Sequence, residues 1–379
     1  IVIMKYNTGL PFFSKDDIDE IIPQLEEILK GNGFFTKGPK VKEFEKLFAE
    51  YIGSQYGVAV NSCTSALELV LKAIGISEDD EVIVPTQTFV STASCVVNNG
   101  GTPIFCEIDH NHLIDFDDLT AKITNNTKAV IIVHFGGLIH PDIWEIKKYL
   151  KERNIYLIED AAHAHGAKID NVFAGNIGDF GCFSFYSTKI MTTGGEGGFI
   201  STNNEKLFDL CSSFGAIGID KKSKNEIYIN AGSNNRLTEF QAILGISQLN
   251  KLESFVKHRI IVAGVYKNKL SQLVEDGLIK FQEYPQNIRH PYWMFMVLIE
   301  NDDYKRTNIK DKLKTDNINI SWPYQPLLHQ QPVFSVLNQK GLKKSEEHTQ
   351  KHLCLPIHLG ITVSDAEYIS TKFIDCFDL

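Results

Sequence analysis

The sequence predicts an α/β fold with two lobes, and three observations carry this prediction. Between about residues 58 and 200, short runs rich in Val and Ile alternate with helix-like segments. This alternation is typical of a mostly parallel sheet covered by helices on both faces. An apolar stripe then runs through residues 238–270, long enough for one helix to bridge two lobes, and 379 residues exceed the usual size of a single core. We therefore predict a large domain over 1–250 and a smaller C-terminal α+β domain over 251–379.

The elements follow in chain order from their periodicity. Residues 39–52 (PKVKEFEKLFAEYI) place apolar side chains at helical spacing with charges on the other side, which predicts a helix packed on the large lobe. The strand-like runs that follow are YGVAV (56–60), EVIVP (81–85), TPIFCEI (102–108), KAVIIVHF (128–135), IYLIED (155–160) and GCFSFY (181–186). Between them lie helix-like segments such as SALELVLKAIG (65–75) and IWEIKKYLKERN (143–154). The chain after residue 270 mixes short strands and helical runs with the Pro-rich piece SWPYQPLLHQQP (321–332).

Composition and charge argue against several classes of protein. An apolar content of 43% with 22% charged residues is that of a soluble globular protein, and no run approaches the length of a membrane span. The net charge of -9 argues against a nucleic-acid partner, which needs a clustered basic face. The seven cysteines are scattered without CxxC spacing, which predicts free thiols in a reducing compartment. We expect a cytoplasmic protein with no membrane partner.

A first candidate for ligand binding is NSCTSALELVL (61–71), which follows the strand GVAV at once. We predict Thr64 as the N-cap of a helix that opens at the carboxyl end of a strand. Free N–H groups and the positive end of the helix dipole make such a start a site for phosphate. A capped helix without any ligand explains the segment equally well when it is considered alone.

A second candidate is IYLIEDAAHAHGA (155–167), in which an apolar strand delivers Asp160 at its carboxyl edge. Ligands of open α/β sheets bind at this edge. A buried carboxylate needs a partner, and a protonated heterocyclic nitrogen would be a suitable one. Capping of the next helix or pairing with an arginine remains the alternative. The nearby histidines invite a metal hypothesis, but their spacing fits no common zinc signature, so we expect no metal at His134, His140, His163 and His165.

The third candidate is Lys189 in FSFYSTKIMTTGGEGGFI (183–200), a glycine-rich loop flanked by hydrophobic strands. A lysine among small residues at the end of a strand can be partly desolvated, which makes its amine nucleophilic. Ser184 offers a hydroxyl for a phosphate oxygen. An ordinary exposed loop lysine is the alternative when the loop is considered alone.

Taken together, a phosphate cradle, a carboxylate at a strand end and a lysine in a small-residue loop are what pyridoxal phosphate (PLP) needs. The lysine holds the aldehyde as an imine, the carboxylate keeps the pyridine nitrogen protonated, and the cradle anchors the phosphate. Phe89, just after the strand EVIV, is a candidate for the aromatic side chain that covers the ring, although a single Phe is usually part of a core.

The sequence resembles the DegT/DnrJ/EryC1/StrS family of PLP-dependent nucleotide-sugar aminotransferases over nearly its whole length. The segments that carry the resemblance are GFFTKGPKVKEFE, NSCTSALEL, GISEDDEVIVPTQTFVSTA, GTPIFCEID, IEDAAHAHGA, SFYSTKIMTTGGEGG and GSNNRLTEFQAILGISQL. The resemblance implies the aspartate aminotransferase-like fold (fold type I) with a large PLP-binding domain.

The resemblance also assigns roles to individual residues. Lys189 matches the lysine that bonds the cofactor, and Asp160 matches the partner of the pyridine nitrogen. Phosphate-binding positions match Thr64, Ser65 and Ser184, the stacking aromatic matches Phe89, and His163 matches a position beside the ring oxygen. Asn234 matches an asparagine that reaches the phosphate of the neighbouring subunit, which implies a homodimer with shared active sites; the adjacent Asn235 leaves the identity of this residue open.

The activity implied by the resemblance is transfer of an amino group from L-glutamate to a keto sugar on a nucleotide, with pyridoxamine phosphate (PMP) as the intermediate form of the cofactor. Such amino sugars serve surface polysaccharides such as lipopolysaccharide O-antigen. The alternative is a sugar dehydratase, but in those relatives histidine replaces the lysine, and Lys189 is present here. A non-catalytic regulatory protein is a further alternative, which the intact lysine, carboxylate and cradle disfavour.

The substrate is predicted only in outline. GFFTKGPKV resembles members that aminate C4 of 4-keto-6-deoxyhexoses, which favours such a sugar, whereas the nucleotide and amination at C3 or C4 stay open. Tyr324 and His329 in the Pro-rich piece are candidates for the mouth of the site, or else ordinary surface residues.

Overall fold

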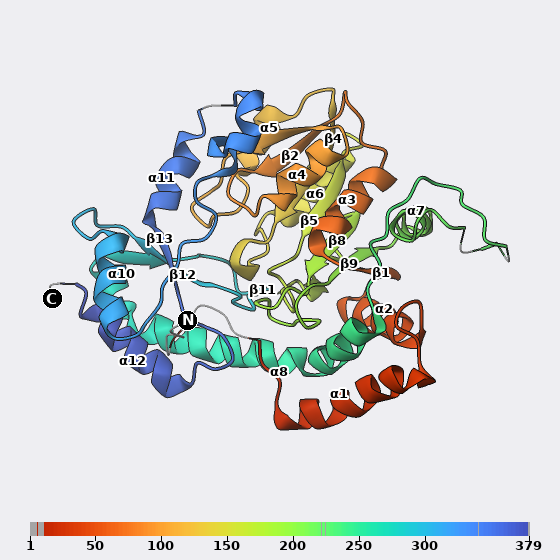
Figure 1. The fold of residues 1–379 in the computed structure, drawn as a ribbon. Coiled ribbons are helices and arrows are strands. Elements are labelled where there is room, and N and C mark those ends of the chain that lie inside the picture. The colour runs from red at the N-terminus through yellow and green to blue at the C-terminus, as the bar shows by residue number, and fades with distance from the viewer. Residues whose placement is uncertain (1–5, 7–10, 221, 224, 340, 378–379) are drawn as a thin grey trace.

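The computed structural model describes residues 6, 11–220, 222–223, 225–339 and 341–377. Two lobes lie side by side along one long helix, α8 (Glu239–Lys269), which passes beneath both of them (Figure 1). The helix begins with a capping box, in which Thr238 and Gln241 satisfy each other's backbone N–H groups. Its first half packs in the large-lobe core through Leu249 and Leu252, and its second half packs in the small-lobe core through Val262 and Tyr266. The predicted bridging helix is therefore confirmed.

A seven-stranded sheet forms the centre of the large lobe, in the order β1-β9-β8-β5-β4-β2-β3. Its strands are β1 (Tyr56–Val60), β2 (Glu81–Pro85), β3 (Thr102–Cys106), β4 (Thr127–Val133), β5 (Tyr156–Asp160), β8 (Phe180–Ser184) and β9 (Gly198–Thr202). From β8 to β3 all neighbours pair in parallel, whereas β9 runs antiparallel to both β8 and β1. The mostly parallel sheet is as predicted.

Helices cover both faces of this sheet. Successive strand residues point to opposite faces, so Val82 and Val84 belong to one core cluster and Ile83 to the other. The helices packed around the sheet are α2 (Pro39–Ile52), α3 (Cys63–Ala73), α4 (Ser91–Asn98), α5 (Phe116–Lys122), α6 (Ile143–Lys151) and α7 (Glu205–Gly215). The predicted helix over 39–52 has these same bounds.

Phe44 and Phe48 of α2 are fully buried. Both meet Phe185 and Phe199 edge-on, with ring centroids between 4.8 and 6.4 Å apart. These two phenylalanines therefore tie α2 to the strands on either side of the glycine-rich loop.

The small lobe is built on an antiparallel sheet of β10 (Ile279–Phe281), β12 (Phe295–Ile299) and β13 (His352–Leu355). Its helices are α9 (Ser271–Glu275), α10 (Arg306–Thr315), α11 (Lys343–Lys351) and α12 (Val363–Ile374).

Helix α1 (Lys15–Glu27) continues into a π-helical turn (Ile28–Asn32). A further small sheet joins β6 (Lys168–Ile169), β7 (Val172–Phe173) and β11 (Ile288–Arg289). The domain boundary at residue 250, which falls inside α8, stays a prediction.

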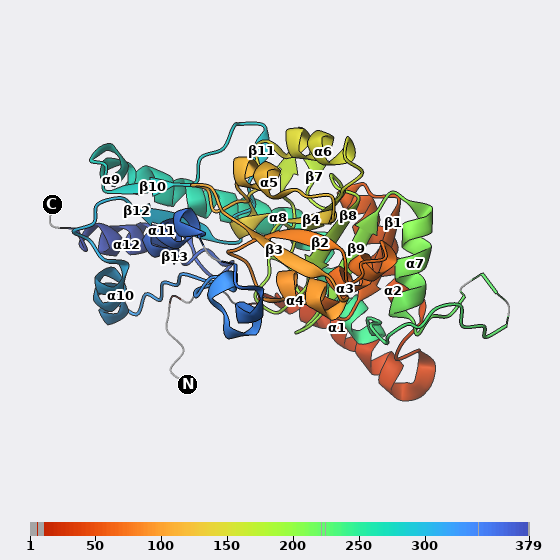
Figure 2. The ribbon, with the colours of Figure 1, turned by 90° about the horizontal axis from the view of Figure 1, so that it is seen from above.

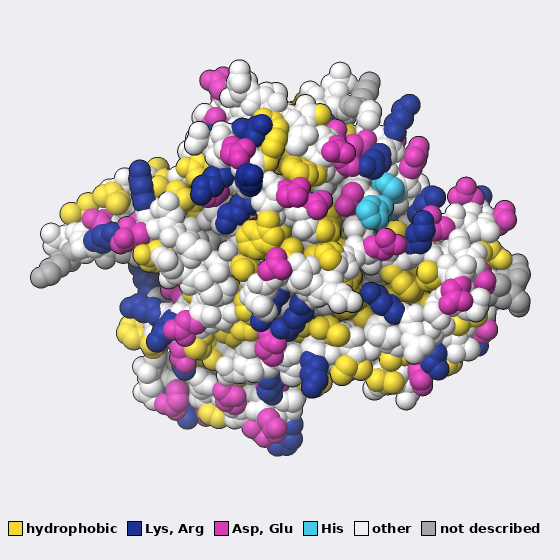
Figure 3. Space-filling view, turned by 180° about the vertical axis from the view of Figure 1, so that it is seen from behind, with side chains coloured by type: hydrophobic (Ala, Val, Ile, Leu, Met, Phe, Trp, Pro, Cys, Tyr) yellow, Lys and Arg dark blue, Asp and Glu magenta, His cyan; other side chains and the backbone are white. Residues whose placement is uncertain are grey.

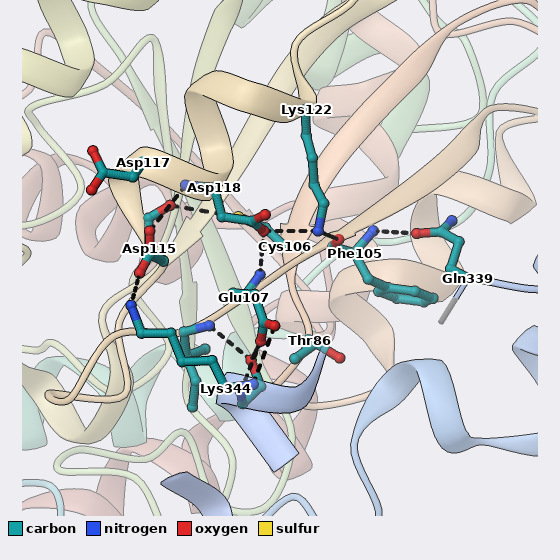
Figure 4. A network of polar contacts seen from close by, with 12 residues as sticks. Thr86, Phe105, Cys106, Glu107, Asp115, Asp117, Asp118, Lys122, Gln339 and Lys344 are labelled. Atoms are coloured by element: carbon teal, nitrogen blue, oxygen red, sulfur yellow. Dashed lines mark hydrogen bonds and ion pairs between the residues drawn. The ribbon is translucent and has the colours of Figure 1, made fainter. Parts of the chain in front are cut away.

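Part of the C-terminal chain returns to the large lobe and packs on the β3 edge of its sheet. Glu107, just after β3, accepts hydrogen bonds from the backbone N–H groups of Lys344 and Ser345 at the start of α11. Lys344 in turn pairs with Asp115 before α5, and Gln339 accepts a hydrogen bond from the Phe105 N–H (Figure 4). The polar contacts of this edge therefore fix the segment that leads from the small lobe back to the strands.

In the described part of the chain, no helix combines the length and the apolarity that crossing a membrane requires. The seven cysteines are free thiols, as predicted. Among the described residues, no group of three or more His, Cys, Asp or Glu side chains is placed to hold a metal ion.

Candidate active site

A cavity of about 550 Å³ opens at the carboxyl ends of the parallel strands. This is the edge at which open α/β sheets bind ligands, and the volume lies within the range of small-molecule sites. Strands β1, β2, β5 and β8 each deliver residues to it, so that predicted residues far apart in the sequence meet here. Those that line the cavity are Thr64, Phe89, Asp160, His163, Ser184, Lys189 and Tyr324.

One end of the cavity is formed by the start of α3. The prediction of Thr64 as the N-cap is wrong: Ser62 has the extended backbone of a cap, and its Oγ accepts a hydrogen bond from the Ser65 N–H at 3.1 Å. Thr64 is the second residue of the helix, and its Oγ1 donates to Ser91 Oγ at 2.8 Å. Because Ser62, Thr64 and Ser65 all carry hydroxyl groups, the sequence could not decide among them. The start of the helix still borders the cavity, with Ser62, Cys63 and Thr64 in its wall, and the first turn of a helix has N–H groups without partners inside the helix.

Close backbone packing holds this helix start in place. A Cβ atom on Gly198, the first residue of β9, would lie only 2.4 Å from the carbonyl carbon of Ser62. Any larger residue would therefore push the start of α3 away from the sheet. Ser65 does not line the cavity, and its Oγ accepts a hydrogen bond from Asn235 Nδ2 at 2.8 Å.

Asp160 ends β5 at the floor of the cavity and is almost completely buried. Its Oδ2 accepts a hydrogen bond from Thr92 Oγ1 at 2.9 Å, and its Oδ1 accepts one from the Ala162 N–H at 3.2 Å. Burial raises the pKa of the Asp160 carboxyl, while these two donors and the nearby Lys189 act in the opposite direction. The carboxylate would therefore gain from a cationic partner inside the cavity.

Lys189 lies in the connection between β8 and β9, where its backbone N–H donates to the Tyr186 carbonyl at 2.9 Å. Its Nζ lies 4.2 Å from the centroid of the Trp293 ring, within the range of a cation–π contact. Burial lowers the pKa of the Lys189 ammonium to about 8, although Asp160 and Cys63 act to raise it. A substantial fraction of the amine is therefore neutral near physiological pH.

Several residues of this cavity were not predicted from the sequence, among them Thr88, Thr92 and Trp293. The Trp293 ring stacks on His163 with centroids 3.7 Å apart and an interplanar angle of 20°, and its Nε1 donates to the Thr188 carbonyl at 2.9 Å. Trp293 stands in RHPYWMFMV before β12, where no spacing or neighbouring motif distinguishes it from a core aromatic.

His163 is held between two aromatic side chains. Its Nε2 lies 3.1 Å from the Tyr324 hydroxyl, whereas its buried Nδ1 has no hydrogen-bond partner among the described residues. Burial and the positive charge of Lys189 keep the pKa of His163 well below its usual value. A neutral ring with an unsatisfied nitrogen therefore faces a cavity that could supply the missing partner.

Phe89 lies at the rim of the cavity, whereas His329 and Asn234 do not line it. Phe89 is 54% exposed at the mouth of the cavity, edge-on to Tyr324 at 6.3 Å. His329 does not line the cavity, because its Nδ1 contacts Thr86 Oγ1 at 2.7 Å and its Nε2 contacts Glu346 Oε1 at 2.9 Å. Asn234 is exposed outside the cavity, and its Oδ1 accepts a hydrogen bond from Arg236 Nε at 3.0 Å.

The arrangement can bind a planar, phosphorylated heterocycle. The N–H groups of α3 suit the anion, the Asp160 carboxylate suits a ring nitrogen that carries a proton, and the Lys189 amine suits a carbonyl carbon. These three groups stand around one cavity, so a single ligand of modest size could meet them all.

Comparisons with known proteins agree with this geometry. The model of the DegT/DnrJ/EryC1/StrS aminotransferase family matches residues 15–374. The chain is 34% identical over 320 residues to GDP-perosamine synthase of Escherichia coli O157:H7, covering 83% of this chain and 84% of the relative. It is 30% identical over 361 residues to UDP-4-amino-4,6-dideoxy-N-acetyl-beta-L-altrosamine transaminase of Campylobacter jejuni, covering 94% of this chain and 93% of that enzyme.

A solved structure shows the same fold. The crystal structure of NtdA from Bacillus subtilis with bound cofactor PMP superposes with a TM-score of 0.87 at 27% identity, covering 99% of this chain and 87% of NtdA. The match of the family model extends from the start of α1 to the last turn of α12, so it includes both lobes and every element that lines the cavity. The chain therefore belongs to the DegT/DnrJ/EryC1/StrS aminotransferase family.

Proposed function

We propose that this aminotransferase transfers the amino group of L-glutamate to a nucleotide-linked keto sugar, and that the sugar is a 4-keto-6-deoxyhexose. The cofactor is PLP, and the fold is fold type I, as predicted. The observation that carries the proposal is the meeting of Lys189, Asp160 and the start of α3 around one cavity. The names of the relatives support a nucleotide sugar, and one of them contains a 4-amino-4,6-dideoxy sugar.

The residues of the cavity fit the cofactor. The free N–H groups at the start of α3, together with the hydroxyls of Thr64 and Ser184, would hold the phosphate. Asp160 would pair with the protonated ring nitrogen, and this pairing would offset the unfavourable burial of its carboxylate. His163 would offer its unsatisfied Nδ1 to the ring oxygen, and Phe89 would cover one face of the ring at the cavity mouth. When bound, PLP supplies an aldehyde that carries the amino group and a ring that accepts electrons.

Lys189 would perform the proton transfers of the reaction. Its amine is tethered in the cavity wall, so it would stay beside the reacting carbon throughout the reaction. With a pKa of about 8, the same group can take a proton in one half of the reaction and return it in the other. L-Glutamate would leave as 2-oxoglutarate, and the keto sugar would leave as an amino sugar.

The part of the cavity wall formed by Tyr324 would receive the sugar. Tyr324 presents an aromatic side chain there, which suits the apolar face of a deoxyhexose, whereas the Trp293 ring is already covered by His163 and Lys189. His329 lies outside this wall and would act only through the chain segment that carries Tyr324. Amino sugars of this kind would serve a surface polysaccharide.

We also propose that the enzyme is a homodimer whose subunits complete each other's sites. The segment between α7 and α8 extends away from the rest of the molecule in two perpendicular views (Figure 1 and Figure 2). Along it, Ile227, Tyr228 and Ile229 expose 46%, 53% and 59% of their surface, and a row of hydrophobic side chains is visible on the projection in Figure 3. Asn235 is partly buried and bonds to Ser65 of its own subunit, whereas Asn234 is exposed and uses its Oδ1 to accept from Arg236, so we assign Asn234 as the residue that reaches the partner through its Nδ2.

The proposal is tested by colour and by product. Purified protein reconstituted with PLP should absorb in the visible, lose that band on borohydride reduction, and lack it as Lys189→Ala. Incubation with L-glutamate and a panel of nucleotide-linked 4-keto and 3-keto sugars should convert a carbonyl to an amine, detected by mass spectrometry. A colourless wild type would refute the assignment of the cavity, and a coloured protein that aminates none of the sugars would refute the substrate class alone.

A further inference from the structure

A chain of two threonine hydroxyls leads from the cavity wall to the Asp160 carboxylate. Thr92, in the first turn of α4, is completely buried and donates from Oγ1 to Asp160 Oδ2 at 2.9 Å. Thr88, in the loop between β2 and α4, places its Oγ1 3.0 Å from Thr92 Oγ1. Both threonines line the same cavity as Asp160.

The direction of these hydrogen bonds follows from counting protons. An ionised carboxylate only accepts, so the single hydroxyl proton of Thr92 must point at Asp160. Thr92 then has no proton left for Thr88, and the proton in the second contact must come from Thr88. Protonation of Asp160 on Oδ2 would reverse the order Thr88 to Thr92 to Asp160, because Thr92 would then have to accept from the carboxyl.

Each link strengthens the next. A hydroxyl that accepts a hydrogen bond becomes a better donor, and a hydrogen bond to a charged acceptor is stronger than one to a neutral acceptor. The second oxygen of Asp160 is held by the Ala162 N–H. The carboxylate is thus fixed in orientation, with a remaining lone pair on each oxygen for a ligand in the cavity.

We propose that Thr92, supported by Thr88, is a positioning residue that keeps Asp160 ionised and oriented, and thereby keeps the ring nitrogen of the cofactor protonated. This inference rests on the proposed role of Asp160 toward PLP. Thr92 acts on the cofactor through Asp160 and makes no contribution to binding the substrate.

Other charged and titratable groups act on Asp160 from the neighbouring elements. They are Lys189 from the β8–β9 connection, His134 after β4, Cys63 at the start of α3, Cys95 in α4, Cys182 in β8 and Tyr324 in the returning segment. A Thr92→Val substitution leaves all of them in place and keeps the branched shape of the side chain. It replaces only the hydroxyl with a methyl group, so a change in the protonation of the ring nitrogen would result from the loss of that hydroxyl.

The test follows the proton on the ring nitrogen directly. Apo-protein is reconstituted with PLP carrying ¹⁵N in the ring, and the ¹⁵N chemical shift is measured between about pH 6 and 9. An ordinary Asp is fully ionised over this range, so a change in the shift would report on the ring nitrogen. The wild type should show a protonated nitrogen, and Thr92→Val should shift toward the neutral form as the pH rises. Thr92→Ser should restore the wild-type shift, and Thr88→Val should move it in the same direction as Thr92→Val but less.

The affinity for PLP gives a second readout. Loss of a hydrogen bond to a charged group should weaken PLP binding about ten- to hundredfold in Thr92→Val. Asp160→Asn serves as the reference that lacks the carboxylate. If Asp160→Asn retains a protonated ring nitrogen, the proposed role of Asp160 is wrong. If Asp160→Asn loses the proton while Thr92→Val and Thr88→Val keep it, the threonine relay is overturned and the proposed function stands. Should Thr92→Val fail to fold, Thr88→Val decides by the same criterion.

Discussion

The Lys189 amine is subject to two opposing effects. Burial lowers the pKa of its ammonium to about 8, while the negative charge of Asp160 acts to raise it. The first effect wins because the cavity removes water from the amine and a single carboxylate restores only part of the lost solvation. The amine is therefore a better nucleophile than an exposed lysine at the same pH.

We expect capture of PLP by the apo-enzyme to follow this pKa. Only the neutral amine attacks the aldehyde, so the capture rate should rise about tenfold per pH unit below about 8 and level off above it. Asp160→Asn removes a charge that stabilises the ammonium, so its profile should shift to lower pH. Stopped-flow absorbance between pH 6 and 10 measures both, and a midpoint near 10 in the wild type would contradict the buried amine.

The sequence allowed the residues with distinctive chemistry to be predicted, and for a physical reason. Lys189 and Asp160 are charged groups next to apolar strands, where a charge without a function is costly. The prediction of Thr64 as the cap is wrong because the cap is decided by backbone angles, which the sequence does not show. Ser62, Thr64 and Ser65 all carry a hydroxyl that could cap the helix. Trp293 was missed because its contact with Lys189 joins residues far apart in the chain, and an isolated aromatic residue indicates only burial.

At the scale of elements, alternation of strand and helix predicted the parallel sheet well. Each predicted strand between 56 and 186 is present, since a run that is apolar on both faces fits few other structures. The direction of β9 could not be predicted in this way. A parallel neighbour needs a crossover helix, and the described chain has no helix between β8 and β9, so β9 runs antiparallel to β8. On its other side β9 pairs with β1, also antiparallel.

A second feature of the elements is the anchoring of the segment that carries Tyr324. His329 bonds both to Thr86 after β2 and to Glu346 in α11, and the Leu328 N–H donates to the Thr86 carbonyl at 2.9 Å. The same edge holds the Glu107 and Lys344 contacts, next to Thr86 in Figure 4. The position of Tyr324 in the cavity therefore depends on a joint between the small lobe and β2.

We expect His329→Ala to release this joint. Thr86 would lose its buried partner, so the free energy of unfolding should fall by about 1–3 kcal/mol. KM for the sugar should rise more than kcat falls, because Tyr324 shapes the wall without reacting. Urea unfolding and steady-state kinetics measure the two effects. Glu346→Gln is the matched control: its amide oxygen still accepts from His329, so both effects should be smaller. Lower stability with an unchanged KM would show that the joint does not position Tyr324.

For the whole molecule, the two lobes depend on one continuous helix. α8 joins the large-lobe core at Leu252 and the small-lobe core at Val262, so the apolar stripe over 238–270 already indicated two packing partners. The return of residues 327–339 and 341–345 to the large lobe could not be predicted. It rests on polar pairs such as Glu107 with Ser345, which lie 238 positions apart and leave no periodic pattern in the sequence.

The proposed sharing of active sites between two subunits can be tested with two variants. Asn234 lies outside the cavity of its own subunit, so its proposed place is the phosphate end of the partner's cavity. Lys189→Ala should inactivate the site of the subunit that carries it, whereas Asn234→Ala should weaken the site of the other subunit. Each variant alone should therefore have little activity.

Mixing the two variants and allowing their subunits to exchange should restore activity. In a mixed dimer, one site carries both substitutions and the other carries neither, because Lys189 comes from one chain and Asn234 from the other. Random exchange makes half of the dimers mixed, with one intact site of two, so activity should reach about a quarter of the wild-type value. Glutamate-dependent amination after refolding of the mixture measures this recovery, and each variant refolded alone is the control. Recovery that stays at the level of the single variants would place Asn234 in its own subunit's site and refute the sharing.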